Sequence, residues 1–476
     1  MIKIVYLPHE ANSLNLGFTD VLYEKSKEIT IVHPKGEILP LGDFPGDFGK
    51  IEKYLISETK DADYLVISVD ALLYGGVVNS RRHYLPKKEL KKRLDLLTLI
   101  KNENPNVKIY AYQTVMRSLP FSQKQGEQDY YGICGEELFL FGQNEHLRRK
   151  RKISGKLYRQ SRRVLLPVCG PYLKDYINRR KLNLLFLGKT INLSGKIIDE
   201  LFIVNDLFAP YGFLGADTEK VNKYCAKHRD KVSAIPSEEG AGLCLVSRII
   251  LKERGESFGV CPIYPDSFDG KMDISVKKII ECVGAGVTDE KNADLLLFCN
   301  VKPSNEEVAL DLIGTRNYAD FIYKMKKALE DKKKIALTDD YLGEGGDLLL
   351  LSGISEKVGV FKLAGYSGRK DVSGAVAESL AESVLFFSDG NVKTHRKRIA
   401  TRIYEDVGIS KADKNVSEAC AKSGKEVTVK AIVKSAQEII EKEIPEVFDR
   451  FKIEQAKLLN VSPFRPYFVV SEKVDK

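Results

Sequence analysis

Residues 64–114 read YLVISVDALLYGGVVNSRRHYLPKKELKKRLDLLTLIKNENPNVKIYAYQT, and this stretch decides the fold. It begins with a short run rich in β-branched and aromatic residues, Tyr64–Val69, and ends with a second such run, Lys108–Thr114. Between the two runs, Pro86 stands at the first turn of a predicted helix, whose apolar residues follow at helical spacing as Leu90, Leu94 and Leu97. Strand, helix and strand in this order are typical of a βα unit in a parallel sheet.

The same alternation continues along most of the chain. The predicted strands are Lys3–Leu7, Ile29–His33, Tyr64–Val69, Lys108–Thr114, Leu201–Asn205, Val232–Ile235, Gly259–Tyr264, Asp294–Cys299, Lys334–Thr338 and Gly359–Ala364. We therefore predict an α/β fold of repeated βα units with a mostly parallel sheet. Periodicity leaves two architectures open, a (β/α)8-like barrel with extra strands and a pair of doubly wound open sheets.

Two regions depart from this alternation. Residues 119–196 carry helical but no strand signals, and strand signals stop again after about residue 390, where a helix around residues 429–440 is interrupted or restarted by Pro445. We predict an α/β core from residues 1–118 and 197–389, which can divide into two subdomains near residue 255. Residues 119–196 form a helical basic insertion, and residues 390–476 form a helical carboxyl-terminal region.

Composition excludes several classes of protein. The net charge of the 476 residues is +9, and nine Lys or Arg with no acid lie between Leu147 and Arg163, so the whole surplus sits in the insertion. No apolar run reaches the ~18 to 20 residues of a membrane helix, and the first residues read as a strand, so we expect a cytoplasmic protein with no membrane contact. The eight cysteines form no C-x-x-C pair and the six histidines no H-x-x-x-H spacing. With no P-loop or dinucleotide fingerprint either, we expect neither a metal nor another cofactor. A metal site built by Asp, Glu and His9 from distant parts of the chain stays open as an alternative.

Polar residues follow nearly every predicted strand. The carboxyl ends of parallel strands meet at one edge of a sheet, so these side chains are expected to converge there. The predicted catalytic residues are Asp206, Asp339 and Glu238. The predicted substrate-binding residues are Asp70, Tyr74, Gly75, Gly76, Arg81, Arg117, Asn205, Tyr211, Asn300, Asp340 and Tyr366. Each of them, taken alone, is explained equally well as a helix cap or a turn residue.

The chemistry follows from the residue types. Neighbouring side chains in an extended segment point to opposite faces, so one carboxylate each from Glu238-Glu239 and Asp339-Asp340 is expected to enter the site. Two such carboxylates suffice for general acid and base catalysis. Gly75-Gly76 permits close approach of the backbone to a ligand, and the fork of Arg81 fits an anion or a carboxylate.

Several short sequence motifs follow one another along the chain, and together they are more specific than any of them alone. They are Asp70-Ala-Leu-Leu-Tyr74-Gly75-Gly76 with Ser80-Arg81, Thr114-Val-Met-Arg117 before Pro120, Asp129-Tyr130-Tyr131, Tyr176 with Arg179, Arg180 and Asn183, Asp206 with Ala209-Pro210-Tyr211-Gly212, Gly345-Gly346-Asp347, and Ala364-Gly365-Tyr366. Over most of residues 60–385, the chain resembles an uncharacterised and mainly bacterial family catalogued as domain of unknown function 4127. It departs from that family's pattern at Pro8-His9-Glu10-Ala11, Asp206-Leu207-Phe208 and Gly365-Tyr366-Ser367-Gly368.

The sequence thus favours a hydrolase that acts on a small polar, carbohydrate-like substrate through strand-end carboxylates, with Tyr211 and Tyr366 stacking on a sugar face. The departures from the family pattern motivate an alternative, a non-catalytic ligand-binding member. A second alternative is contact with an anionic polymer through the basic insertion. Nucleic acid is not expected as the partner, because aromatic interleaving there is limited to Tyr158 and no known binding motif surrounds it. The sequence does not specify an oligomeric state.

Overall fold

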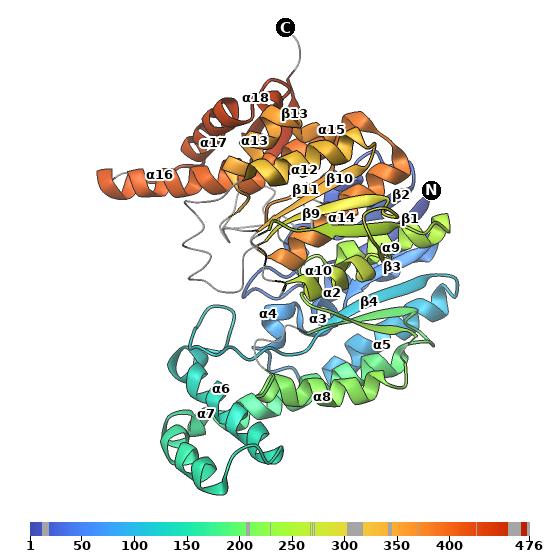
Figure 1. Cartoon of the computed structure of the whole chain (residues 1–476). Coiled ribbons are helices and arrows are strands. Elements are labelled where there is room, and N and C mark those ends of the chain that lie inside the picture. The colour runs from blue at the N-terminus through green and yellow to red at the C-terminus, as the bar shows by residue number, and fades with distance from the viewer. Residues whose placement is uncertain are drawn as a thin grey trace. The chain divides into compact units, whose positions relative to one another are not determined.

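The computed structural model describes residues 1–11, 19–205, 210–228, 230–266, 268, 270, 272–301, 318–340, 345–369, 371–424, 426–455 and 468–473. The chain divides into two compact units (Figure 1). The amino-terminal unit comprises Ile2–Asn15 and Thr30–Glu238, and the carboxyl-terminal unit comprises Met1, Leu16–Ile29 and Glu239–Lys476. Each unit is built on its own parallel sheet, so the predicted repetition of βα units is confirmed, and of the two architectures it is the pair of open sheets that the chain adopts.

The sheet of the amino-terminal unit has six strands. Their order is β2 (Ile29–Val32), β1 (Ile2–Leu7), β3 (Tyr64–Ser68), β4 (Lys108–Thr114), β5 (Glu200–Val204) and β6 (Val232–Ile235). The pairings from β1 across to β6 are all parallel. Every residue of β3 is buried, as expected for a strand covered on both faces. The carboxyl ends of these strands therefore share one edge.

Helices α2 (Phe48–Glu58), α5 (Lys87–Glu103), α7 (Gly155–Leu193) and α8 (Phe213–Cys225) contact one another in series in the same unit. The predicted insertion is indeed helical: α6 (Tyr131–Arg149) packs against α7. Ser154 caps α7 by accepting a hydrogen bond from the Leu157 amide at 3.2 Å. Buried residues on both helices, including Leu138, Phe141 and Cys169, form an apolar core of their own. This core fixes α7 relative to the segment that leaves β4.

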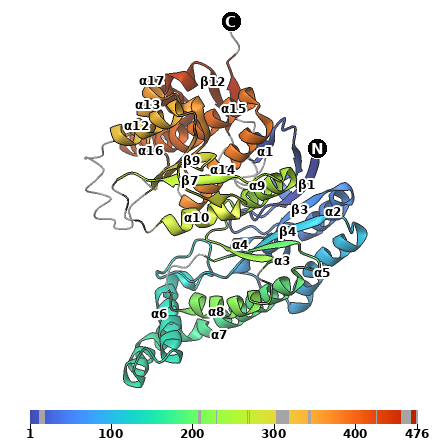
Figure 2. The same ribbon diagram turned by 45° about the vertical axis from the view of Figure 1, so that its right-hand side comes forward.

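The carboxyl-terminal unit has five strands, in the order β11 (Leu363–Ser367), β10 (Lys334–Asp340), β9 (Leu295–Val301), β7 (Gly259–Ile263) and β8 (Gly286–Val287). Helices α12 (Tyr318–Glu330) and α13 (Leu348–Lys357) lie on one face of this sheet, and α9 (Ala241–Arg254), α10 (Asp273–Cys282) and α14 (Val372–Asp389) lie on the other (Figures 1 and 2). The sheet is therefore doubly wound.

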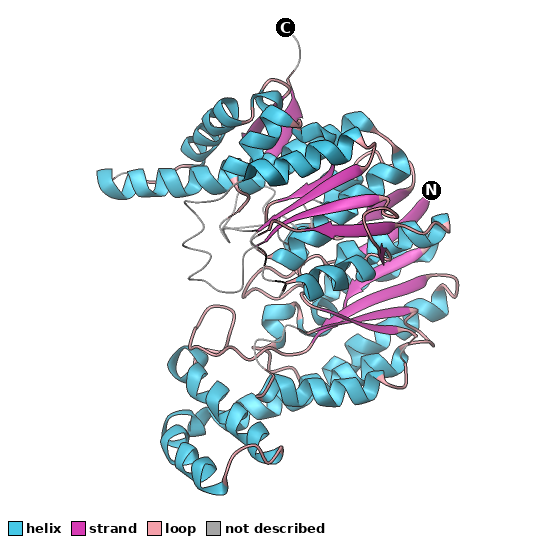
Figure 3. Ribbon diagram, in the orientation of Figure 1, coloured by secondary structure: helices cyan, strands magenta, loops and turns pink. Residues whose placement is uncertain are grey.

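The region after residue 390 is mainly helical, as predicted. It contains α15 (Val392–Ile403), a π-helix over Tyr404–Ile409, α16 (Ser410–Ser423), α17 (Val429–Glu443) and α18 (Pro445–Phe448), which starts at the proline named above. An antiparallel pair of strands, β12 (Phe451–Gln455) and β13 (Phe468–Glu472), was not predicted (Figure 3). Two five-residue strands more than ten residues apart give too weak a local signal, and only their pairing stabilises them.

The last strand of the carboxyl-terminal sheet also differs from its prediction. We predicted it over Gly359–Ala364, but Val360–Lys362 form a 3₁₀ turn and the strand covers Leu363–Ser367. As a result, Tyr366 lies inside a strand and not after it. The strands β9 and β10 also extend two residues past their predicted ends, so they include Asn300, Asp339 and Asp340. Within the described part of the chain, no helix combines the length and the apolar character that crossing a membrane requires.

Candidate functional site

Asp70 lies at the carboxyl edge of the six-stranded sheet, in the first turn of α3 (Val69–Tyr74) directly after β3. Ser68 ends the strand and caps the helix, because its hydroxyl accepts the Ala71 amide at 3.2 Å. The cap sets the direction of the chain, so Asp70 turns back toward the neighbouring strand. There its Oδ2 accepts a hydrogen bond from the Thr114 amide, at the end of β4, at 2.7 Å.

The environment of Asp70 changes its acidity. The residue is 1% exposed, and this burial raises the pKa of its carboxyl from 3.8 to about 7. The Thr114 hydrogen bond opposes this shift, the charge of Glu238 adds to it, and the charge of His9 opposes it. Glu238, half-buried after β6, and His9, after β1, therefore lie within electrostatic reach of Asp70. Three strands of the sheet thus supply titratable groups to one place.

His9 is held in position by β4. Its backbone amide donates to the Tyr112 hydroxyl at 3.0 Å, and its ring meets the Tyr112 ring edge-on, with the ring centres 6.2 Å apart. His9 is 3% exposed. The strand exits of β1 and β4 are therefore tied together beside Asp70.

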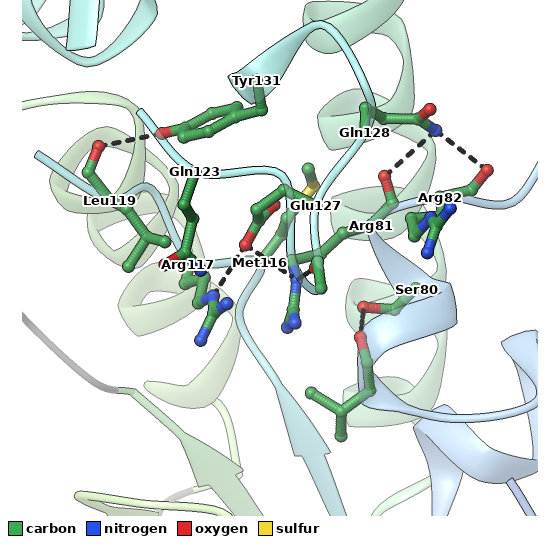
Figure 4. Close-up of polar contacts among 12 residues, drawn as sticks. Ser80, Arg81, Arg82, Met116, Arg117, Leu119, Gln123, Glu127, Gln128 and Tyr131 are labelled. Atoms are coloured by element: carbon green, nitrogen blue, oxygen red, sulfur yellow. Dashed lines mark hydrogen bonds and ion pairs between the residues drawn. The ribbon is translucent and has the colours of Figure 1, made fainter. Parts of the chain in front are cut away.

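Two arginines flank the same edge and share one carboxylate (Figure 4). Arg81 Nε lies 3.0 Å from Glu127 Oε1, and Arg117 Nε donates to that same oxygen at 2.8 Å. Arg81 Nε also donates to the Gly126 carbonyl at 2.9 Å. Burial lowers the pKa of Arg81, and the positive charge of Arg117 lowers it further. The negative charges of Glu127, Glu238 and Asp70 act in the opposite direction and raise this pKa. The arginine pair and the two strand-end acids are therefore electrostatic neighbours.

Helix α7 holds the backbone of both arginine segments. Arg180, 3% exposed, donates to the Met116 carbonyl at 2.7 Å and to the Arg117 carbonyl at 2.9 Å, and it pairs with Asp217 at 2.9 Å. Asn183 donates to the Ser80 carbonyl at 2.7 Å. The insertion therefore does more than carry charge, because its buried polar residues position the loops at the sheet edge.

Three further predicted residues, Tyr74, Gly75 and Gly76, lie four to six residues after Asp70. Tyr74 is buried and stacks on His83 with the ring centres 4.7 Å apart. Gly75 has φ of 80° and Gly76 has φ of 132°, and a Cβ on either would lie within 2.8 Å of Pro45 or Pro40. The prolines Pro45 and Pro40 thus occupy the space over these two glycines, where the sequence predicts a ligand.

The remaining predicted residues of the amino-terminal unit lie apart from these contacts. Asn205 accepts a hydrogen bond from the Thr218 hydroxyl at 3.2 Å. Tyr211 accepts a hydrogen bond from Lys152 and packs edge-on against His146, with the ring centres 5.6 Å apart, so it faces the basic insertion. Asp206 lies outside the described residues.

The other predicted residues belong to the carboxyl-terminal sheet. Asp339 is fully buried, and its oxygens accept hydrogen bonds from the Asn300 side chain at 2.7 Å and from the Asp347 amide at 2.6 Å. Asp340 and Tyr366 are buried as well. Asp70 follows a strand of one sheet and Asp339 lies near the end of a strand of the other, so the strand-end argument brings Asp70 together with Glu238, and Asp339 with Asn300, but it does not join the two sets.

The carboxyl-terminal unit also contains a buried ionic network that no pattern in the sequence predicts. Arg402 is fully buried and pairs with Asp406, with Glu405 at 2.8 Å and with Glu378 at 3.8 Å. Asp406 also accepts the Gly368 amide at 2.8 Å, which ties the π-helix to the end of β11. Every charge in this set has an opposite partner, so we interpret it as a structural tie.

Glu127, His9 and Thr114 were missing from the predicted site. Thr114 ends a predicted strand and His9 follows another, but their contacts depend on which strands are neighbours. Glu127 lies eleven residues after Met116, in the loop that follows β4. Nothing in its spacing to other residues identifies it as part of a site. Arg180 and Asn183 occur in the strings shared with the family, which marks them as candidates. Their role in holding the loops is visible only in the folded chain.

Comparisons with known proteins add one finding. The family model described as "Protein of unknown function (DUF4127)" matches residues 4–462. No curated protein matches the chain. Among solved structures, a "putative transcriptional regulator" from Clostridium difficile 630 aligns over 99% of this chain and 98% of that one, with 11% sequence identity and a TM-score of 0.20. A TM-score this low carries no argument about fold or function.

Proposed function

Since the chain belongs to the DUF4127 family, whose description gives no activity, we propose from its own residues that it is a hydrolase of a small polar, carbohydrate-like substrate, with Asp70 and Glu238 as acid and base. The proposal moves the acid role from Asp206 and Asp339 to Asp70. Asp339 is engaged by two hydrogen bonds inside its own sheet. Asp206 lies outside the described residues.

The observation that carries the proposal is a buried carboxyl with a charged neighbourhood at a parallel-sheet edge. Asp70 is 1% exposed and has no cation bonded to it in the described structure, while Glu238 and Arg81 lie within electrostatic range. Burying a carboxyl this way is costly, and such groups cluster at functional sites. The carboxyl edge of parallel strands is also where ligands of open α/β sheets bind.

The chemistry uses the difference between the two acids. A carboxyl with a pKa of about 7 is partly protonated at neutral pH, so Asp70 can donate its proton to the oxygen of the leaving group. Glu238 takes a proton from water, whose oxygen bonds to the electrophilic carbon as the bond to the leaving group breaks. The sum is addition of one water across the bond.

The experiment is a screen of the full chain on p-nitrophenyl glycosides, followed by kinetics of Asp70→Asn and Glu238→Gln on the substrate found. Each variant should lose ~10² to 10⁴ in kcat, the usual share of general acid–base catalysis. The matched control is Asp63→Asn, because Asp63 lies before β3, and Asp70 after it. In the native protein, activity should fall as the pH rises through about 7.

The outcomes separate the proposal from its alternative. Full turnover by Asp70→Asn rejects Asp70 as the acid. Ligands that raise the melting temperature of the chain without any release of p-nitrophenol would instead support the non-catalytic binding protein.

A second candidate function rests on the surface of the insertion. Eight of its nine basic residues are exposed, namely Arg148, Arg149, Lys150, Arg151, Lys152, Lys156, Arg159 and Arg163, whereas Arg162 pairs with Glu145 at 2.6 Å. Such a surface fits an anionic polymer. Retention on heparin should then fall steeply with salt and should drop when Arg159 and Arg163 are changed to Gln. Retention that these substitutions leave unchanged would reject this candidate.

A further inference from the structure

Arg81 and Arg117 leave most of their hydrogen-bonding capacity unused. A guanidinium carries five N–H donors, and both side chains contact Glu127 through Nε. Among the described residues, the terminal nitrogens of neither arginine have a hydrogen-bond acceptor. Figure 4 shows both guanidinium groups extending from Glu127 toward the same side.

Burial makes this arrangement unusual. Arg81 is 4% exposed, so most of the residue is removed from bulk water, and an acceptor that meets its terminal N–H groups would stabilise the cation. The Arg117 side chain is 27% exposed and forms the accessible half of the pair. Glu127 is 3% exposed and contacts both arginines, but its single negative charge balances only one of their two positive charges.

The two terminal groups are also neighbours. A Cβ placed on Gly126 would lie 3.3 Å from Arg81 Nη2 and 3.6 Å from Arg117 Nη2. Both nitrogens therefore border the space beside one residue that has no side chain. Gly126 has φ of 72°, a conformation that favours glycine, and a Cβ there would press on Arg81 Nη2, so a glycine at this position lets the two nitrogens lie side by side.

We propose that Arg81 and Arg117 together bind an anionic group of the substrate, a carboxylate or a phosphate, through their terminal nitrogens. The inference rests on the proposed function, because it assigns a substrate class to the same site: a small polar molecule that carries a negative charge. The two neighbouring guanidinium groups offer several N–H donors, which suit the two or more acceptor oxygens of a carboxylate or a phosphate.

The pair is preorganised for this role. Arg180 fixes the carbonyl of Arg117, and Gln128 donates to the carbonyls of Arg81 and Arg82 at 3.4 Å and 2.9 Å. Glu127 holds the two Nε atoms. Little side-chain freedom is left to lose when an anion binds, which favours affinity.

The test is calorimetric titration of the full chain with inorganic phosphate in one arm and malonate in the other, which separates the two anion classes. Arg117→Gln should weaken binding by at least ~10-fold, as expected for a lost charged hydrogen bond, and Arg117→Lys should restore only part of it. The matched control is Arg82→Gln, which removes the same charge one residue from Arg81, where the side chain pairs with Asp43.

A second variant is expected to increase the affinity for the anion, and misfolding cannot explain an increase. Glu127→Gln removes a negative charge beside the arginines but keeps a side-chain oxygen that can still accept from their Nε atoms, so it should tighten anion binding, whereas a purely structural role predicts loss or no change. The inference is overturned if neither anion binds the native chain at low salt, or if Arg82→Gln weakens binding as much as Arg117→Gln.

Failure of this inference and failure of the proposed function give different results. Asp70→Asn should lose turnover while it still binds the anion. Turnover without anion binding would reject only the arginine site, and anion binding without turnover on any glycoside would reject only the hydrolase.

Discussion

Asp70→Asn should stabilise the amino-terminal unit, and by more at high pH than at low pH. The folded pKa of Asp70 is about 7, compared with 3.8 in an ordinary environment. A raised pKa means that the folded state holds the proton more tightly. The contribution of Asp70 to the free energy of unfolding is therefore fully present below pH 3.8 and is lost as the pH rises. Above about pH 7 the loss is complete, and the free energy no longer changes with this group.

The size of the effect follows from the shift. Each pKa unit corresponds to ~1.4 kcal/mol, so the ionised carboxyl costs the native unit up to about 4 kcal/mol above pH 7. Asparagine carries no charge, and its side-chain oxygen can still accept the Thr114 amide. Between pH 5 and pH 8, the advantage of the variant over the native chain should therefore grow by about 2 to 3 kcal/mol.

The assay is native-state amide hydrogen exchange of peptides from β3 and β4, followed by mass spectrometry. The native chain and Asp70→Asn are compared at the same pH, so the pH dependence of the exchange chemistry cancels. Asp63→Asn serves as the control and should show no such growth. A difference between Asp70→Asn and the native chain that is the same at pH 5 and pH 8 would refute the reasoning.

Three further predictions concern stability and are checked by thermal or urea unfolding. Arg180→Ala should cost ~3 to 5 kcal/mol, because it breaks the ion pair with Asp217 and leaves the carbonyls of Met116 and Arg117 without their donor, whereas Arg162→Ala, in a half-exposed pair, should cost less than ~1 kcal/mol; equal costs would contradict the structural role of α7. Arg402→Ala should likewise cost ~3 to 5 kcal/mol in the carboxyl-terminal unit, and a near-neutral result would show that its acids are not ionised there. Gly75→Ala should destabilise more than Gly42→Ala, since both have positive φ but only the first would meet another residue, at 2.8 Å; the reverse order would disprove the packing argument.

The fold was largely predictable because its signals are local. Alternating buried runs and amphipathic stretches specify strands and helices, and the parallel direction of the strands explains why Asp70 and Glu238 lie at the same edge of their sheet. The insertion and the start of α18 at Pro445 were equally local, since helical spacing and proline act within a few residues.

The candidate site was predictable only in part. The sequence named Asp70, Glu238, Arg81 and Arg117, but it placed them with Asp339 on a single rim. Strand order and the division into two sheets depend on pairing between segments that are far apart, and periodicity contains no information about partners.

The sequence by itself thus determined the βα alternation, the helical insertion and the polar residues at the strand ends. Only the tertiary structure decided that Glu127 stands between two arginines, that Arg180 and Asn183 hold the loops beside them, and that Asp70 is buried. The physical reason is that burial, hydrogen bonding and charge interactions act across space, so the acidity of a carboxyl is set by neighbours that the chain brings from elsewhere.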